Sequence, residues 1–217
     1  GKANIYKLHP FGEFTLEESP EELTKTRENY AKAMMEILRR TDPDGKFFIY
    51  GWPFSCPFVQ WSKQDVKTLL NAFPDNKIYV GDAWGEENPT YKKYDYFYGK
   101  KWVFGIIYMF GNMDFMQGNI KKAIESFHIL ANDAKARNCA GIDINPEITH
   151  YNEIYMNLLT RLCWNPKAVT YEGFIDDYVS KRFGVSNKNI MKPALNALVN
   201  AAYSEVPGTE AMYHKRQ

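Results

Sequence analysis

Apolar residues occur along this chain in short runs that alternate with longer stretches of helical periodicity. Five of the runs are rich in β-branched and aromatic residues, as buried strands are. They span Asn4–His9, Lys46–Trp52, Lys77–Asp82, Trp102–Tyr108 and Cys139–Ile144. A regular alternation of strands and helices predicts an α/β fold built on a parallel sheet.

Helix start signals lie between the strands. Ser19 is followed by Pro20 and two glutamates, which combines an N-cap residue, a proline in the first turn and favourable acids. Ser62 with Asp65 three residues later indicates a second helix start. From about residue 171 the pattern is purely helical, over 171–183 and 188–203, with Gly184 as the stop between them.

Five strand–helix units are too few to close an eight-stranded (β/α)8 TIM barrel. An open doubly wound sheet is the alternative, but no glycine-rich phosphate loop follows the first strand, which disfavours a nucleotide-binding fold. We therefore predict that residues 1–165 are the C-terminal part of a (β/α)8 catalytic barrel, with its remaining strands outside this chain. Residues 166–217 are predicted to begin an all-α domain, with a loose tail from about residue 205.

The composition disfavours several classes of function, beginning with nucleic-acid binding and membrane binding. A formal net charge of +1 gives no electrostatic reason to bind nucleic acid or an anionic membrane. No run approaches the ~20 apolar residues of a membrane span. No signal peptide opens the chain, which starts directly on a strand as a fragment would. The three cysteines share no metal spacing and are interpreted as buried free thiols. The chemistry considered below needs neither a metal nor an organic cofactor, and none is expected.

Two glutamates carry the candidate chemistry. Glu13 and Glu147 each lie on a short loop just after a predicted strand. Catalytic side chains of a parallel barrel gather at the carboxyl ends of its strands. Aromatics make up 16% of the residues and crowd the middle third, where they serve either as core or as stacking platforms for sugar rings. Two carboxylates among aromatic residues favour a glycosidase.

At these loops the sequence resembles the alpha-N-acetylglucosaminidase family, glycoside hydrolase family 89, over roughly residues 3–205. The resemblance rests on several short segments in the family's order and spacing. They are Phe11-Gly12-Glu13, Gly51-Trp52-Pro53-Phe54, Asp82-Ala83-Trp84-Gly85-Glu86-Glu87-Asn88-Pro89, Phe110-Gly111, Pro146-Glu147 with Asn152-Glu153, and Phe183-Gly184-Val185.

The resemblance implies a retaining, exo-acting hydrolase that releases a terminal alpha-linked N-acetylglucosamine from a glycan. It implies Glu13 as the general acid/base and Glu147 as the nucleophile. It also implies a secreted, periplasmic or lysosomal setting. The residues that we expect to bind the substrate lie at or just past strand ends, and they are Trp52, Asp82, Trp84, Glu86, Tyr108 and Phe110.

Some positions depart from the family pattern, and they leave the sugar open. Tyr108-Met109 replaces a His-Asn pair, and Met113 replaces an asparagine. The alternatives are a related retaining glycosidase acting on a different sugar, a noncatalytic carbohydrate-binding protein, and an interaction module. For Asp82 and Glu86, the alternative to binding the substrate is a structural role that supports the site without touching the substrate.

Overall fold

The structure is a computed structural model that describes residues 4–14, 16–56, 59, 61–108, 118–146 and 152–204. The chain folds as two compact units. The first comprises residues 1–106 and 134–145, and the second comprises residues 107–133 and 146–217. The boundary near residue 165, between a barrel and an all-α domain, stays a prediction.

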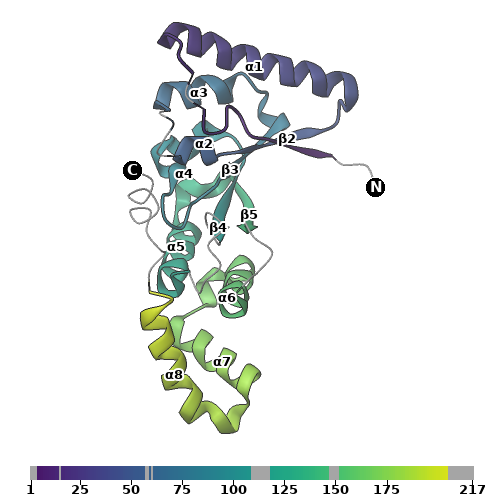
Figure 1. The fold of residues 1–217 in the computed structure, drawn as a ribbon. Coiled ribbons are helices and arrows are strands. Elements are labelled where there is room, and N and C mark those ends of the chain that lie inside the picture. Colours follow the sequence, from purple (N-terminus) through teal and green to yellow (C-terminus); the bar gives the residue numbers. More distant parts are fainter. Residues whose placement is uncertain are drawn as a thin grey trace. The chain divides into compact units, whose positions relative to one another are not determined.

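A five-stranded sheet confirms the α/β architecture expected from the strand–helix alternation (Figure 1). The strands pair in chain order from β1 to β5, and the pairs from β1 to β4 are parallel. Their bounds are β1 Ile5–Leu8, β2 Lys46–Tyr50, β3 Ile78–Asp82, β4 Trp102–Tyr108 and β5 Cys139–Pro146. The carboxyl ends of the parallel strands share one edge of the sheet, where the candidate site residues are expected.

The prediction that the first strand is buried is wrong. Ile5 is 57% exposed and Tyr6 is 36% exposed. Within the described sheet β1 is an edge strand that pairs with β2 alone. An edge strand leaves one row of backbone hydrogen-bonding groups for a further strand to bind. The apolar run indicated a strand correctly, but burial requires a neighbour that the described residues do not supply.

The sheet is strongly curved. At the end of β5, Asn145 donates a hydrogen bond from Nδ2 to the hydroxyl of Tyr50, at the end of β2, over 2.8 Å. These two strands are three places apart in the sheet. On a flat sheet that is about 14 Å, at about 4.8 Å per strand, and side chains on one face would run parallel without meeting. The contact therefore requires a sheet that curls as the wall of a barrel does.

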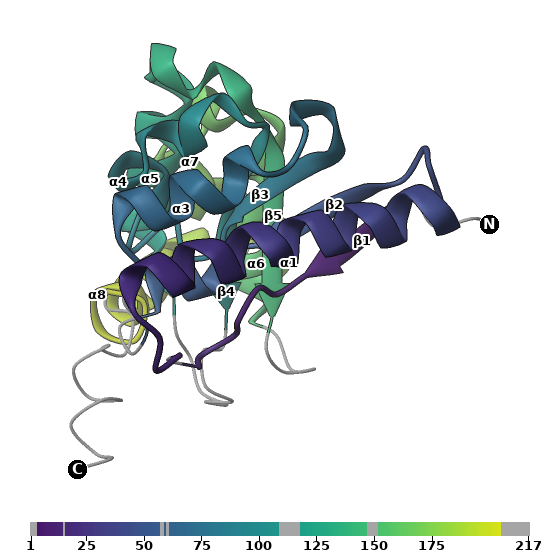
Figure 2. The same ribbon diagram turned by 90° about the horizontal axis from the view of Figure 1, so that it is seen from above.

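Helices α1 (Pro20–Thr41) and α3 (Lys63–Asn71) lie side by side on one face of this sheet (Figures 1 and 2). Both begin as the sequence predicts. Ser19 caps α1 and Ser62 caps α3, each in a capping box with the acidic residue three positions later. Shorter helical segments complete the first unit, namely α2 Trp52–Ser55, η1 Asp75–Lys77, α4 Thr90–Lys93, η2 Asp95–Gly99 and η4 Ala134–Asn138.

Much of the aromatic excess belongs to the core of the first unit. The rings of Tyr91 and Trp102 stack at 4.7 Å with an angle of 16° between their planes, and Phe97 packs edge-on against Trp102. All three side chains are fully buried. These residues therefore stabilise the fold through apolar burial and ring geometry, and they are not surfaces for a sugar.

Four helices lie in the described part of the second unit, and they are α5 Ile120–Asn132, α6 Glu153–Trp164, α7 Tyr171–Phe183 and α8 Lys188–Ala201, with the short turns η5 Pro166–Ala168 and η6 Val185–Asn187. The bounds of α7 are those predicted, and α8 ends two residues before the predicted 203. The tail expected to be loose lies almost entirely outside the described residues.

The three cysteines are free, as expected, but they are not all buried. Cys56 is buried, Cys139 is partly exposed and Cys163 is exposed. Cys163 follows Leu162, which is fully buried on the apolar stripe of α6. Adjacent helical residues point about 100° apart, so the thiol turns toward the exposed side of the helix.

Candidate active site

The loop that carries Glu13 is a turn fixed by the packing of Phe11. Phe11 and Gly12 adopt left-handed backbone conformations, with φ of 60° and 52°. The N–H of Phe14 donates to the carbonyl of Phe11 over 3.1 Å. A left-handed phenylalanine is strained, and its ring is held 5.1 Å from that of Tyr30 on α1. The turn leaves the Glu13 side chain exposed just past the end of β1.

Trp52 holds the Glu13 carboxylate. The indole Nε1 of Trp52 donates to Oε1 of Glu13 over 2.7 Å, and the Trp52 ring lies 6.4 Å from the ring of Trp84. Trp52 follows Gly51, where a Cβ would lie only 2.1 Å from the carbonyl oxygen of Gly81. Glycine is thus needed where β2 turns into α2 beside β3. The loops after β1 and β2 thus meet at this carboxylate, and the loop after β3 reaches Trp52 through the Trp84 ring.

Asp82 is fully buried, and its carboxyl is used within the fold. It accepts hydrogen bonds from the backbone N–H groups of Thr90 and Tyr91, over 3.2 and 3.3 Å, and from the Thr90 hydroxyl. These N–H groups lie in the first turn of α4, where an acidic group is stabilising. Burial raises the pKa of Asp82 to about 7, although the hydrogen bonds from Thr90 and Tyr91 lower it.

These contacts favour the structural alternative for Asp82. The carboxyl anchors α4 to the end of β3 and so closes the loop that presents Trp84 and Glu86. Within that loop the N–H of Asn88 donates to the carbonyl of Trp84 over 2.8 Å. Glu86 is 5% exposed and Trp84 is 6% exposed. Direct binding of a substrate by Asp82 or Glu86 remains a prediction.

We expect Asp82→Asn to gain stability relative to the wild type as the pH rises from about 4 to about 7. The pKa of Asp82 is about 7 in the fold against an ordinary value of 3.8. The folded state therefore binds more protons than the unfolded state between these values, so wild-type stability falls with rising pH and the loss is complete above about 7. The free energy of unfolding that the wild type loses over this pH range is roughly 4 kcal/mol, at 1.36 kcal/mol per pKa unit.

Thermal unfolding of the complete protein and of the Asp82→Asn variant, between about pH 4.5 and about pH 8, measures this difference. Thr90→Val is the matched control, because it removes one hydrogen bond to the Asp82 carboxyl and keeps the ionisable group. A difference between wild type and Asp82→Asn that does not change with pH contradicts the expectation.

A second polar group lies at the ends of β1, β2 and β5, around Tyr50. The Lys7 ammonium lies 4.0 Å from the centre of the Tyr50 ring, and the His9 ring meets it edge-on at 5.4 Å and 80°. The Asn145 side chain donates to the Tyr50 hydroxyl. Tyr50 is 7% exposed. It is therefore held by a cation on its ring, a second ring at its edge and an amide at its hydroxyl.

Burial and neighbouring charges set the protonation of this group. Burial lowers the pKa of His9, and the Lys7 ammonium lowers it further, while the Glu13 carboxylate opposes both. Burial raises the pKa of Asp143 on β5, against the effect of Lys7. The neutral form of His9 is thus favoured.

Tyr108 belongs to the second unit and is buried there, with 2% exposure. Its hydroxyl accepts a hydrogen bond from the backbone N–H of Asn152 over 2.9 Å, and its ring stacks on that of Tyr155 at 5.4 Å. Burial raises the pKa of Tyr108 to about 12. Substrate contact by Tyr108 stays a prediction, and Glu147 and Phe110 lie outside the described residues.

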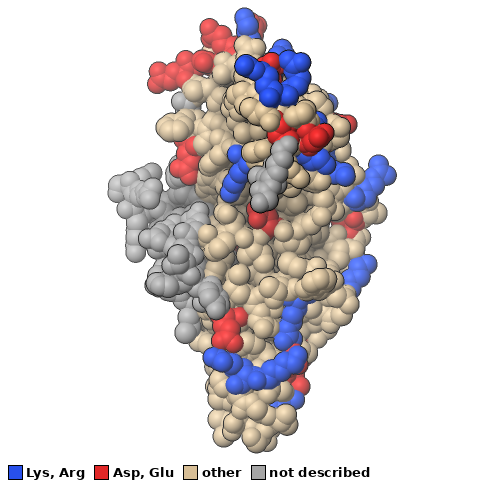
Figure 3. Space-filling view, turned by 90° about the vertical axis from the view of Figure 1, so that its right-hand side faces the viewer, with Lys and Arg blue, Asp and Glu red and all other residues tan. Residues whose placement is uncertain are grey.

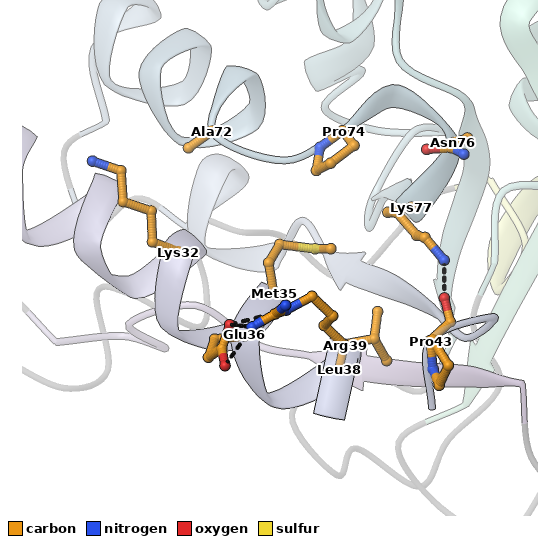
Figure 4. Close-up of a pocket in the computed structure, with 10 residues that line it drawn as sticks. All are labelled: Lys32, Met35, Glu36, Leu38, Arg39, Pro43, Ala72, Pro74, Asn76 and Lys77. Carbon is orange, nitrogen blue, oxygen red and sulfur yellow. Dashed lines mark hydrogen bonds and ion pairs between the residues drawn. The ribbon is translucent and has the colours of Figure 1, made fainter. Parts of the chain in front are cut away.

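Two hollows in the first unit lie apart from this cluster. One, of about 430 Å³, is an apolar groove between α1 and the segment before β3, lined by Met35, Leu38, Pro43, Ala72 and Pro74 (Figure 4). The other, of about 600 Å³, is lined by residues of α2, the start of α3 and the α4 region. Neither is lined by Glu13 or Trp52. The groove lies toward the amino ends of β2 and β3, and residues at that end of a barrel serve stability.

The described residues give no sign of a metal or membrane site. Among them no group of three or more His, Cys, Asp and Glu side chains is placed to hold a metal ion. The helices in the described ranges are also too short or too polar to cross a membrane. On the face shown in Figure 3, acidic and basic side chains are interspersed without a field of one sign.

Sequence reasoning missed Tyr50, Lys7 and Asn145. Tyr50 is the last residue of β2 and Asn145 is the residue before the last of β5, and each lies two positions before a predicted site residue, which is the signal that was available. Side chains alternate along a strand, so residues two apart share a face. Applied to the predicted strand Lys46–Trp52, this alternation places Tyr50 on the same face as Trp52 and would have found it.

Comparison with known proteins points to one family. Residues 1–166 match the family model described as the alpha-N-acetylglucosaminidase (NAGLU) tim-barrel domain. The alpha-N-acetylglucosaminidase of Homo sapiens is 22% identical over 156 residues, which are 71% of this chain and 21% of that protein.

Two solved structures from Clostridium perfringens share the fold. One is CpGH89, with two glutamates replaced by glutamine, in complex with its substrate GlcNAc-alpha-1,4-galactose. It matches with a TM-score of 0.72 and 23% identity, over 92% of this chain and 21% of that chain. The other is a family 89 glycoside hydrolase in complex with PUGNAc, with a TM-score of 0.71 and 22% identity. The match covers 94% of this chain and 21% of that chain. This chain thus spans about a fifth of the length of these relatives, and an incomplete TIM barrel is confirmed.

Proposed function

Since this chain belongs to the alpha-N-acetylglucosaminidase (NAGLU) tim-barrel domain family, we propose that it supplies the C-terminal part of the catalytic barrel of a retaining, exo-acting glycoside hydrolase. The proposed substrate is a glycan with a terminal alpha-linked N-acetylglucosamine. The activity is that of the complete protein, because the rest of the barrel lies outside this chain. A secreted, periplasmic or lysosomal setting is part of the proposal.

The hydrogen bond between Trp52 and Glu13 is the observation that carries the proposal. It fixes an exposed carboxylate at the carboxyl end of a barrel strand, where catalytic groups of this fold lie. Charge-assisted hydrogen bonds are stronger than neutral ones and hold their geometry. The Trp84 ring beside Trp52 adds aromatic surface at the same place.

In the proposed mechanism Glu13 protonates the glycosidic oxygen while Glu147 attacks the anomeric carbon. A covalent glycosyl-enzyme forms, and Glu13 then takes a proton from the water that releases the sugar. Retaining glycosidases hold the two carboxyl groups about 5–5.5 Å apart, and we propose that separation here. Support comes from the motif context of both glutamates and from the Clostridium perfringens structure in which two glutamates were replaced.

The proposed sugar subsite combines the aromatic residues with few polar anchors. Trp52 and Trp84 cover the apolar face of one terminal sugar, and Tyr108 and Phe110 complete the wall. Asp82 and Glu86 support the loop between β3 and α4 and supply any polar contact from that side. A pocket for a single sugar suits exo action.

Assay of the complete protein on a panel of aryl alpha-glycosides tests the function. We expect the alpha-N-acetylglucosaminide to be hydrolysed fastest, with the alpha anomer of the sugar released first, as NMR can follow. Preference for another sugar supports the related-glycosidase alternative. Tight binding of sugars with no hydrolysis across the panel supports the noncatalytic one.

Trp52→Phe is expected to lower kcat/KM by about tenfold to a hundredfold, because a hydrogen bond to a charged group is worth about 1.5–3 kcal/mol. The variant keeps an aromatic ring but loses the pyrrole part of the indole together with the donor to Glu13, and the control variant removes the same atoms from another indole. Trp61→Phe is the matched control, since the Trp61 Nε1 is buried and has no hydrogen-bond partner among the described residues. Equal kinetics for both variants contradict the role of Trp52.

A further inference from the structure

Lys7 and Asp143 lie on the concave face of the curled sheet. The Tyr50 and Asn145 side chains define this face, because they meet across the curve from β2 and β5. Asp143 precedes Asn145 by two residues on β5, so it shares that face. Lys7 shares it too, since Lys7 pairs with Phe48 on β2 and Phe48 precedes Tyr50 by two residues. One cation and one carboxyl group thus line the inside of the barrel wall.

Both side chains lie toward the carboxyl end of the sheet, near Glu13. The Lys7 ammonium reaches the ring of Tyr50, the last residue of β2, at 4.0 Å. His9 lies within electrostatic reach of both Lys7 and Glu13, since burial and the Lys7 charge lower the pKa of His9 and the Glu13 charge raises it. Burial raises the pKa of Asp143 and the Lys7 charge lowers it. The order of electrostatic neighbours is therefore Glu13, His9, Lys7 and Asp143.

The fold does not use the hydrogen-bonding capacity of these two groups. Among the described residues, the Lys7 ammonium and the Asp143 carboxyl form no ion pair and no hydrogen bond, and they are exposed and partly exposed. Lys100, by contrast, is 4% exposed and donates to the carbonyl of Phe73 and to the Asp75 carboxylate, as a structural lysine does. Lys7 and Asp143 therefore keep their donors and acceptors for a ligand.

Resting on the proposed function, we propose that Lys7 and Asp143 bind two adjacent hydroxyl groups of the terminal sugar and so determine which sugar the site accepts. An ammonium only donates hydrogen bonds, and a carboxylate only accepts them. A vicinal diol matches this pair, because each hydroxyl is both a donor and an acceptor. A pyranose whose anomeric carbon lies at Glu13 directs its 3- and 4-hydroxyls away from Glu13, and these are the two groups assigned to the pair.

This contact accounts for two properties of the proposed site. A hydroxyl that carries a further sugar has lost its donor and gained bulk, so it no longer satisfies Asp143, and only a free non-reducing end fits. A sugar that lacks one of the hydroxyls, or holds it on the other side of the ring, leaves a charged group unpaired. Unpaired polar groups in a site are what reject such an analogue.

Hydrolysis of deoxy substrates by the complete protein tests the proposal. An aryl alpha-N-acetylglucosaminide is compared with its 3-deoxy and 4-deoxy analogues. In the wild type we expect each missing hydroxyl to lower kcat/KM by about tenfold to a hundredfold, which is the worth of a hydrogen bond to a charged group. In Lys7→Met and in Asp143→Ala, we expect the parent substrate and at least one deoxy analogue to differ by less than about threefold. Wild-type ratios in both variants overturn the proposal.

Lys46→Met is the matched control. Lys46 lies on the same face of β2 and also has a tyrosine ring, that of Tyr79, at 5.6 Å, but it is at the amino end of the strand. We expect this variant to keep the wild-type ratios between the parent and deoxy substrates. A ratio that falls equally in Lys46→Met and Lys7→Met overturns the proposal. Partial loss of the fold lowers the rate on all three substrates together, so it leaves the ratios unchanged.

Binding of free sugars separates this inference from the proposed function. Calorimetric titration of the complete protein with N-acetylglucosamine and with its 3-deoxy and 4-deoxy analogues measures the contact without hydrolysis. A wild type that binds N-acetylglucosamine more tightly than both analogues but hydrolyses no glycoside counts against the proposed function alone, and loss of that preference in Lys7→Met supports the inference. A wild type that hydrolyses the glycoside but binds all three sugars equally overturns the inference alone. Absence of binding to any of the sugars overturns the inference as well.

Discussion

Turnover by the complete protein is expected to fall by about 10⁴-fold or more when Glu147 is replaced by alanine, the scale seen when a catalytic nucleophile is lost. No group then remains to attack the anomeric carbon from the face opposite the leaving group. Steady-state hydrolysis of an activated aryl alpha-N-acetylglucosaminide measures the loss. Azide is expected to restore part of the rate, because the small anion fits where the carboxylate was.

The product formed with azide identifies the role of Glu147. Azide attacks from the side of the missing nucleophile in one displacement, so the expected product is the beta-glycosyl azide. Glu153→Ala is the matched control, because Glu153 is an acid at the start of α6 that pairs with Arg182 over 3.2 Å. Full activity in Glu147→Ala would show that Glu147 is only a helix-terminal charge favoured by the dipole.

Glu13→Gln is expected to lower kcat/KM by about 10²–10⁴-fold, the usual contribution of general acid–base catalysis. The amide keeps the size of the side chain and can still contact Trp52, but it cannot supply a proton to the leaving oxygen. The loss should be large for a glycoside with a poor leaving group and small for a dinitrophenyl glycoside, which leaves without protonation.

The product formed with azide also distinguishes a general acid/base role for Glu13 from a nucleophile role. With the nucleophile intact, azide intercepts the glycosyl-enzyme and gives the alpha-glycosyl azide. Glu17→Gln serves as the control, since Glu17 is an exposed acid close to Glu13 in the sequence. A variant whose loss is the same for every leaving group contradicts a general acid role for Glu13.

The sequence by itself determined the elements that depend on local interactions. The capping boxes at Ser19 and Ser62 formed as predicted, because a cap needs only side chains within one helical turn. The end of α7 at Gly184 formed as predicted, because glycine readily takes the positive φ that stops this helix. Strand order followed too, because parallel strand–helix units place successive strands side by side.

Tertiary structure alone decided which side chains meet. The Trp52–Glu13 and Tyr50–Asn145 contacts join residues 39 and 95 positions apart, and the second exists only because the sheet curls. The apolar run of β1 could not show that this strand lies at an edge of the sheet. The motif around Asp82 likewise could not show that its carboxyl turns into the fold to cap α4. The periodicity of a segment predicts its secondary structure, whereas its burial and its side-chain contacts depend on which other segments pack against it.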